Sequence, residues 1–155
     1  MGGGPGRAPP AETRGLKVLV DTSAWVDFFN GSASPERTAL AALFESPHQV
    51  CTCGVVVSEV FQGLRRTAER GRLAELFLDL ELVEPHGIEL YFRAADLYRA
   101  LRERGKTIRS TIDCLIAVLA EEHGCALLAR DRDIETILAS GVLRLSRWPP
   151  EAPPS

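Results

Sequence analysis

Short apolar segments alternate along this chain with longer segments in which apolar residues recur at helical spacing. Residues 16–20 form one of the short segments, and residues 110–123 form one of the helical ones. A short apolar run bounded by turn residues is typical of a strand buried on both faces, whereas a 3.6-residue repeat is typical of a helix packed on a core. Strands that alternate with helices in this way predict a three-layer α/β fold, in which helices flank a central, mostly parallel sheet.

The alternation continues from residue 16 to residue 145. Ser34 and Pro35 predict a helix start, and Gly105 and Gly124 predict helix ends. The predicted strands are residues 16–20, 50–52, 82–83, 125–129 and 142–145, and the predicted helices are residues 24–29, 34–44, 55–66, 68–80, 87–104, 110–123 and 134–139.

Length and composition predict one folded domain. Of the 155 residues, 45% are hydrophobic and 25% are charged, which is the balance of a globular protein that buries its own core. The Gly- and Pro-rich residues 1–15 are expected to be a disordered leader or a remnant of expression, and residues 149–155 a disordered tail, so the domain spans residues 16–148. No apolar run approaches the roughly 20 residues that cross a bilayer, and residues 1–15 lack the apolar stretch of a secretory signal. We therefore expect a cytoplasmic protein that does not bind membranes.

Cysteine and histidine residues do not indicate a zinc finger. No two cysteines have a CxxC spacing, and the histidines complete no zinc-finger pattern. These residues are Cys51, Cys53, Cys114, Cys125, His48, His86 and His123. We expect the cysteines to be small buried side chains in a reducing cytoplasm.

Acidic residues follow predicted strands or lie on the inward faces of predicted helices. Asp21 comes directly after the first strand, Asp131 comes just after the fourth, and Asp133 is two residues further on. Glu59 lies on or beside the apolar stripe of its helix, and Asp113 is in the first turn of another helix. In open α/β sheets, ligands bind beyond the carboxyl ends of the strands, where the strand order reverses. Asp21 and Asp131 are therefore expected at a binding site.

Each of these acidic residues also has a purely structural alternative. The alternatives are a helix cap at Asp21, a capping box of Ser110 and Asp113, an N-cap at Asp131 or Asp133, and an ion pair of Glu59 with Arg65 or Arg66. Capping explains the acidic residues one by one, but it does not explain why they share strand ends and inward faces.

A cluster of carboxylates predicts a bound cation. Several carboxylates within a few ångströms repel one another and become partly protonated unless a cation lies among them. Oxygen ligands without histidine or cysteine favour a hard ion, either Mg²⁺ or Mn²⁺. Such a centre can activate water and neutralise charge on a phosphoryl group, so phosphodiester hydrolysis is the expected chemistry.

Four sequence segments resemble the PIN domain, and most of all VapC, the toxin of VapBC toxin–antitoxin pairs. The resemblance covers nearly all of residues 16–145, and its specificity comes from four acidic motifs in the same order with matching flanks. The segments are LKVLVDTSAWVDFF, VVVSEVFQG, GKTIRSTIDCLIAVLAEEHG and ALLARDRDIETI.

The resemblance implies a strand order of 3-2-1-4-5 and a metal-dependent endoribonuclease that leaves a 3′-hydroxyl and a 5′-phosphate. It also implies a homodimer and a VapB-type antitoxin partner. The apolar helices between residues 34 and 80 are candidates for the dimer face. Ile134 stands where the family often has Phe. By position, the family's catalytic metal ligands correspond to Asp21, Glu59, Asp113 and Asp131, its additional acidic ligand to Asp133, and its hydroxyl residues near metal or phosphate to Thr22 and Ser23.

Basic residues flank the acidic segments, although the net charge of the chain is −3. They could hold the RNA backbone beside the acidic site, with Arg109 as the candidate nearest in sequence to Asp113, or they could simply form solvated helix faces. One group follows the Glu59 segment and the other precedes Asp113: Arg65, Arg66, Arg70 and Arg72, and Arg99, Arg102, Arg104, Lys106 and Arg109.

Two other functions are weighed against a ribonuclease. A haloacid-dehalogenase-like phosphotransferase needs a second aspartate two residues after the first, where this chain has Ser23, and a lysine, of which only Lys17 and Lys106 exist. A catalytically silent PIN-like scaffold that binds RNA or a protein partner would be expected to lack one of the four acidic residues. All four are present.

Overall fold

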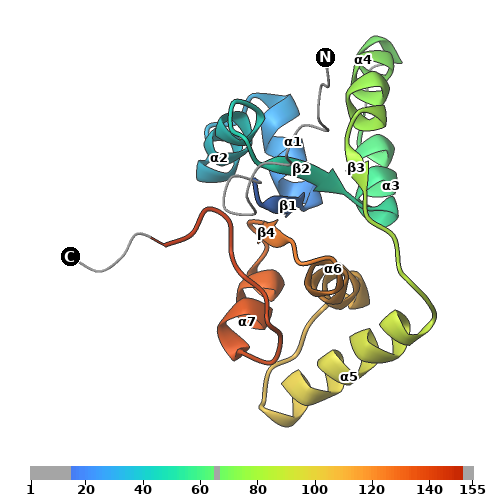
Figure 1. Cartoon of the computed structure of the whole chain (residues 1–155), viewed down its shortest axis with the longest axis vertical. Coiled ribbons are helices and arrows are strands. Elements are labelled where there is room, and N and C mark those ends of the chain that lie inside the picture. Colours follow the sequence, from blue (N-terminus) through green and yellow to red (C-terminus); the bar gives the residue numbers. More distant parts are fainter. Residues whose placement is uncertain (1–14, 65–66, 152–155) are drawn as a thin grey trace, which may run out of the picture.

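The computed structural model describes residues 15–64 and 67–151, and Figure 1 shows the arrangement of its elements. The predicted leader and much of the predicted tail lie outside these ranges, so the expected domain boundaries stay predictions. Among the helices of the described ranges, none is long and apolar enough to cross a membrane.

A parallel sheet with the strand order β3-β2-β1-β4 forms the centre of the molecule. In its register Val18 of β1 lies opposite Val50 of β2 on one side and opposite Ala126 of β4 on the other. The predicted order of these four strands and their parallel direction are confirmed. The strands are β1 (Lys17–Val20), β2 (Gln49–Thr52), β3 (Glu81–Leu82) and β4 (Ala126–Leu128).

The prediction of a fifth strand at residues 142–145 is wrong. Instead, Arg147 makes a single parallel bridge with Leu127, and the N–H of Leu127 donates to the carbonyl of Ser146 over 2.9 Å. The apolar side chains of residues 142–145 pack against the core without strand pairing. The chain therefore reaches the edge of the sheet beside β4, where the fifth strand was expected, but pairs there only briefly and a few residues later.

Helices cover both faces of the sheet, which confirms the three-layer α/β prediction. In Figure 1, α1, α2 and α4 lie above the sheet and α5, α6 and α7 lie below it. The helix predicted at residues 55–66 ends at Gln62, and residues 65 and 66 are outside the described ranges. The helices are α1 (Thr22–Asn30), α2 (Pro35–Phe44), α3 (Gly54–Gln62), α4 (Thr67–Leu78), α5 (Glu89–Glu103), α6 (Thr111–Glu122) and α7 (Arg132–Ser140).

Helix α6 is the central helix of the lower layer. It packs against α5, α7 and β4, and its residues 116–120 are all buried, so it is apolar on almost every side. Gly105 after α5 and Gly124 after α6 have φ angles of 76° and 64°, which favour glycine and end these helices as predicted. The first and last turns of α6 are its least apolar parts, and both carry charged side chains.

Candidate acidic metal centre

Two aspartates are placed by the carboxyl ends of neighbouring strands. Asp21 follows β1 and is 6% exposed, and its N–H donates to the carbonyl of Leu128 at the end of β4 over 2.8 Å. Asp131 follows β4 and occupies the N-cap of α7. The strand order reverses at β1, because β2 lies on one side and β4 on the other. Both aspartates therefore lie at the switch point where α/β sheets bind ligands.

Ser23 joins the start of α1 to the loop that carries Asp131. Its hydroxyl donates to Asp21 Oδ2 over 3.2 Å and accepts the backbone N–H of Arg130 over 3.2 Å. The Arg130 guanidinium also pairs with Asp27 Oδ2 of α1 at 2.8 Å. Ser23 therefore holds the Asp21 carboxylate in place, and its predicted contact with substrate stays a prediction.

Three carboxylates from two helices come together beside this point. One oxygen each of Asp113, Asp131 and Asp133 lie within 4.8 Å of one another, the kind of group that could hold a metal ion. Asp113 comes from the first turn of α6, whereas Asp131 and Asp133 come from the start of α7. The predicted convergence of the α6 acid with the acids after β4 is therefore present in the structure.

Capping and clustering coexist in these residues. Asp131 Oδ1 accepts the N–H of Asp133 over 2.7 Å, so the N-cap alternative is correct for Asp131 while the same side chain belongs to the cluster. Ser110 caps α6, but its hydroxyl accepts the N–H of Ile112 and not that of Asp113, which the capping-box alternative required. Asp113 is consequently free to face the other carboxylates.

Glu59 approaches the same place from α3. It is half-buried between Val56 and Val60, which are both buried, as predicted from the helical spacing. The alternative ion pairs with Arg65 or Arg66 lie outside the described residues. Within the described part of the chain, no basic side chain forms an ion pair with Glu59. Its negative charge acts on Asp21 and on Asp113, so it belongs to the same group of carboxylates.

Burial and repulsion raise the pKa of Asp21. Burial contributes most, while hydrogen bonds from the Thr22 backbone and the Ser23 hydroxyl act in the opposite direction. The charges of Glu59 and Asp131 raise the pKa further. Asp21 is therefore a carboxylate whose ionised form would be favoured by a nearby cation.

The pKa of Asp113 is raised from its ordinary value of 3.8 to about 7. Burial is the largest cause, followed by the negative charges of Asp131, Asp21, Asp133 and Glu59. The other four carboxylates thus all act electrostatically on Asp113, and two of them, Glu59 and Asp131, also act on Asp21. We call this group, Asp21, Glu59, Asp113, Asp131 and Asp133, the acidic centre.

The starts of α1, α6 and α7 all meet at the acidic centre. Asp21 precedes α1, Asp113 lies in the first turn of α6, and Asp131 precedes α7. Each helix N-terminus carries a partial positive charge, which favours carboxylates and phosphate groups. This offsets part of the repulsion among the five acids, although the raised pKa values of Asp21 and Asp113 show that it does not offset all of it.

Arg109 and Thr22 border the acidic centre. The backbone N–H and the Nε of Arg109 donate to Asp133 Oδ2 over 2.9 and 3.3 Å, while the Arg109 side chain is 71% exposed. Asp133 therefore ties α7 to the loop before α6, which places Asp113. Thr22 Oγ1 is buried and has no hydrogen-bond partner among the described residues. The predicted role of both residues in binding substrate stays a prediction.

Arg130 and Arg132 were not among the predicted site residues. The backbone of Arg130 holds Ser23, and Arg132 lines a surface hollow of about 540 Å³ together with Arg104 and Lys106. The alternation of basic and acidic residues in the segment RDRD could have indicated Arg132 from the sequence. The hydrogen bond between Ser23 and the Arg130 backbone joins residues 107 apart, so no local pattern could have indicated it.

Comparison with known proteins places this geometry in a family. A profile of the PIN domain matches residues 18–137. Ribonuclease VapC11 of Mycobacterium tuberculosis and a VapC ribonuclease of Mycobacterium bovis are each 33% identical to the chain over 121 residues, which cover 77% of the chain and 90% of each relative.

Solved structures share the fold at lower sequence identity. The structure of VapBC2 from Rickettsia felis, bound to a DNA fragment from its promoter, covers 86% of the chain and 99% of its own, with a TM-score of 0.65 and 19% identity. VapBC-1 from nontypeable Haemophilus influenzae covers 86% and 98%, with a TM-score of 0.64 and 14% identity. The extent of the profile match and the identity to the mycobacterial relatives show that the chain belongs to the PIN-domain family, in its VapC branch.

Proposed function

We propose that the protein is a metal-dependent endoribonuclease and the toxin of a toxin–antitoxin pair. The observation that carries the proposal is the gathering of five carboxylates at the switch point of a PIN fold. The mycobacterial relatives are named ribonucleases, and the similar solved structures are VapBC complexes. The substrate would be RNA and the reaction the hydrolysis of phosphodiester bonds.

The donor set of the acidic centre fits Mg²⁺ or Mn²⁺. Its side chains offer only carboxylate oxygens, which hard divalent ions prefer. Two thiols lie nearby, but burial raises the pKa of Cys53 and of Cys114 to about 11, so both are protonated at neutral pH and are poor ligands. The buried Thr22 hydroxyl, which has no partner within residues 15–64 and 67–151, is a further oxygen next to Asp21.

Asp21, Asp113 and Asp131 would hold the cation. Glu59 and Asp133 would add further negative charge around it. A bound ion would polarise the scissile phosphate and make a water molecule more acidic. The chain itself keeps the carboxylates in position: Ser23 holds Asp21, and Asp133 joins α7 to the loop before α6 through Arg109. Because the pKa of Asp113 is about 7 without a cation, loading would displace a proton from a fraction of molecules at neutral pH.

A basic groove beside the acidic centre would hold the RNA strand. Arg104, Lys106 and Arg132 line the hollow of about 540 Å³, which extends along α7 to Ser140. Glu135 also lines it, and its carboxylate pairs with Arg147. Arginine and lysine contacts to phosphates supply affinity without reading the sequence. Two other predicted basic residues belong to a different surface, because Arg70 lies over the Phe61 ring and Arg72 lines an apolar hollow.

An antitoxin would bind the apolar surface formed by α1 and α4. A hollow of about 280 Å³ is lined by Phe29, Leu64, Leu73 and Leu76, with Glu69 and Arg72 among its lining residues. Phe29 is exposed there, whereas Leu64 and Leu76 are half-buried and Leu73 is buried. A surface hollow lined mainly by apolar side chains is typical of a protein interface. We propose that a VapB-type segment with apolar side chains occupies it.

A second copy of the chain would pair through other exposed apolar residues. Phe44 and Leu78 lie within the predicted dimer region and are exposed, and Leu78 is the most exposed of the large apolar side chains described, at 83%. We propose a homodimer, which light scattering would detect.

The four cysteines are free buried thiols, which agrees with the proposed place of action in a reducing cytoplasm.

Cleavage of total cellular RNA tests the proposed activity. Purified protein is incubated with Mg²⁺, Mn²⁺ or EDTA, alongside Asp21→Ala and Asp113→Asn. Asp96→Asn, an exposed acidic residue on α5, is the matched control. We expect metal-dependent cuts at a few sites with wild type and control, and none with the other two variants. Cleavage that survives in both variants would remove the acidic centre from the mechanism. RNA binding without cleavage by wild type would favour the silent scaffold.

A further inference from the structure

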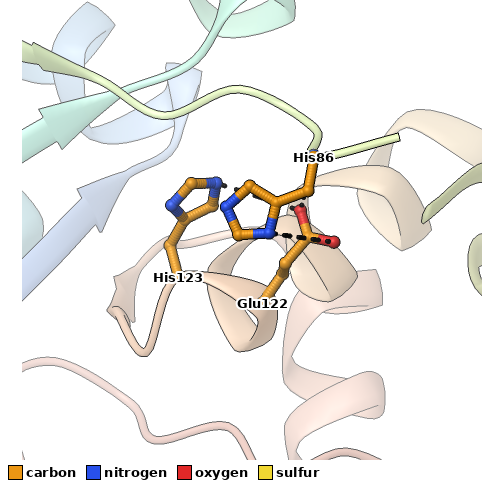
Figure 2. A group of neighbouring side chains, drawn as sticks. All are labelled: His86, Glu122 and His123. Carbon is orange, nitrogen blue, oxygen red and sulfur yellow. Dashed lines mark hydrogen bonds and ion pairs between the residues drawn. The ribbon is translucent and has the colours of Figure 1, made fainter. Parts of the chain in front are cut away.

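A second group of potential ligands lies at the other end of α6. Figure 2 shows His86, from the loop after β3, above Glu122 in the last turn of α6 and His123 just beyond it. One ligand atom from each lie within 4.8 Å of one another. His86 Nδ1 is 3.8 Å from Glu122 Oε1, and His123 Nε2 is 3.9 Å from Glu122 Oε2. The two imidazole rings lie 4.7 Å apart. We call these three residues the imidazole cluster.

The chemistry of the imidazole cluster differs from that of the acidic centre. Two imidazoles and one carboxylate are ligands that Zn²⁺ binds in proteins, and Co²⁺ and Ni²⁺ accept the same set. A hard ion such as Mg²⁺ prefers oxygen alone. The imidazole cluster would therefore favour a transition-metal ion over Mg²⁺.

Neighbouring groups hold the ligand side chains in place without a bound metal ion. The backbone N–H of His86 donates to Glu122 Oε2 over 3.2 Å, and Arg93 lies 4.0 Å from the same carboxylate. The side chains of Glu122 and His123 are 15% and 16% exposed, so both have restricted freedom. Two of the three ligands, Glu122 and His123, are therefore ordered before a metal ion binds, which lowers the entropic cost of binding.

The carbonyl of Glu84 adds an oxygen to the cluster. His123 Nε2 is 2.7 Å from this oxygen and donates its proton to it when the ring carries the proton on Nε2. The other neutral tautomer, with the proton on Nδ1, presents the Nε2 lone pair to a cation instead. The Glu84 carbonyl would then lie beside the ion, where it or a water molecule can complete the coordination.

The imidazole cluster and the acidic centre are separate sites. Glu122 and Asp113 are nine residues apart on α6, which corresponds to about 14 Å along the helix axis. No residue belongs to both groups. We propose that His86, Glu122 and His123 bind a Zn²⁺-type cation, which fastens the loop between β3 and α5 to the C-terminal end of α6.

Zinc titration of the untagged full-length protein tests this site. The protein is kept in excess Mg²⁺ to occupy the acidic centre, and Zn²⁺ binding is measured by calorimetry. We expect one strong site per chain, and an affinity at least about tenfold lower in His86→Ala and in His123→Ala. His48→Ala, which changes the remaining histidine of the chain, just before β2 and outside the imidazole cluster, is the control and should bind as wild type does. Co²⁺ absorption spectra would report nitrogen ligation in wild type and lose that signature in both variants.

The outcomes separate this proposal from the nuclease proposal. His86 has a 69% exposed side chain, so His86→Ala should fold as wild type does, and circular dichroism checks this. Asp113→Asn should keep the strong Zn²⁺ site even if it cleaves no RNA. Absence of a strong site in wild type, or equal affinity in wild type and both histidine variants, would overturn the proposal and leave the cluster as a hydrogen-bonded link between the loop and α6.

Discussion

The two ends of α6 carry different kinds of ligand on the same helix. At the N-terminal end, Asp113 faces other carboxylates and its pKa is raised to about 7. At the C-terminal end, Glu122 faces His86 and His123 and has Arg93 nearby. The first group carries an excess of negative charge, whereas in the second the Glu122 carboxylate has two imidazoles and a guanidinium as neighbours.

Helix electrostatics explains why this arrangement is tolerated. The N-terminal end of a helix favours anions and the C-terminal end favours cations. Three helix N-termini meet at the acidic centre, and they favour five buried or half-buried carboxylates lying close together. The imidazole cluster has no such crowding. The difference between the two ends therefore lies in unbalanced charge, and changes that remove charge should act in opposite directions at the two ends.

The largest effect is expected from Asp21→Asn on RNA cleavage. Loss of one central carboxylate should remove several kcal/mol of transition-state stabilisation supplied through the cation, or about a thousandfold in rate. Single-turnover cleavage with Mg²⁺ measures it. Glu121→Gln, at the opposite end of α6 and outside the imidazole cluster, should cleave as fast as wild type. An equal loss of cleavage rate in both variants would contradict a catalytic role of the acidic centre.

A smaller effect is expected from Ser23→Ala, which removes the hydroxyl between Asp21 and the Arg130 backbone. Loss of a group that orients a metal ligand costs about 10- to 100-fold in metal affinity or activity. The activity should recover in part at high Mg²⁺ concentration, which a change that only unfolds the protein would not show. Ser58→Ala, an exposed serine next to Glu59, is the matched control. Wild-type Mg²⁺ dependence in Ser23→Ala would contradict the role given to Ser23.

Stability should respond with opposite signs at the two ends of α6. The pKa of Asp113 is 3.8 in its ordinary state and about 7 in the folded, metal-free protein. Between these values the folded state holds more protons than the unfolded state, so the free energy of unfolding falls as pH rises. Asp113→Asn removes this loss. Allowing for solvent screening of a half-buried group, the variant should be more stable than wild type at pH 8 by about 1–2 kcal/mol.

The matching change at the other end is Glu122→Gln. This change removes the carboxylate that pairs with Arg93 and accepts the His86 backbone N–H. It should therefore lower the free energy of unfolding by about 1 kcal/mol or less. Urea unfolding of EDTA-treated protein at about pH 5 and 8 measures both variants. A wild-type stability that does not fall over this range, or a loss of stability in Asp113→Asn at pH 8, would contradict the charge imbalance proposed for the N-terminal end.

Local sequence patterns predicted most of the fold and the acidic centre, but not the contacts that support it. Strand-end and helix-face positions were enough to bring Asp21, Asp113 and Asp131 together, because sheet geometry converts sequence position into spatial position. The strand predicted at residues 142–145 failed because apolar alternation indicates burial, and burial here occurs without pairing. The hydrogen bond of Ser23 and the meeting of His86 with His123 depend on tertiary packing between segments far apart in the chain, which spacing does not encode.

The smallest effect is expected when one exposed arginine is removed at each end of α6. Arg109 lies beside the acidic centre with most of its side chain in solvent, whereas Arg93 pairs with Glu121 at the other end. Each phosphate contact to a single strand contributes about 0.7 to the slope of log affinity against log salt. In Asp113→Asn, which we expect to bind RNA without cutting it, Arg109→Gln should reduce the slope by about this amount and weaken binding severalfold.

Arg93→Gln in the same background should leave the slope unchanged, because its partner is an acidic residue outside the proposed RNA path. Fluorescence anisotropy with labelled RNA at several salt concentrations measures both variants. Folding should be little affected, since exposed ion pairs contribute about 1 kcal/mol or less. If both variants lowered the slope equally, RNA would contact both ends of α6, and the division between a nucleic-acid end and a structural end would fail. If only Arg109→Gln lowered it, the RNA strand would pass the start of α6, where the acidic centre can reach its phosphates.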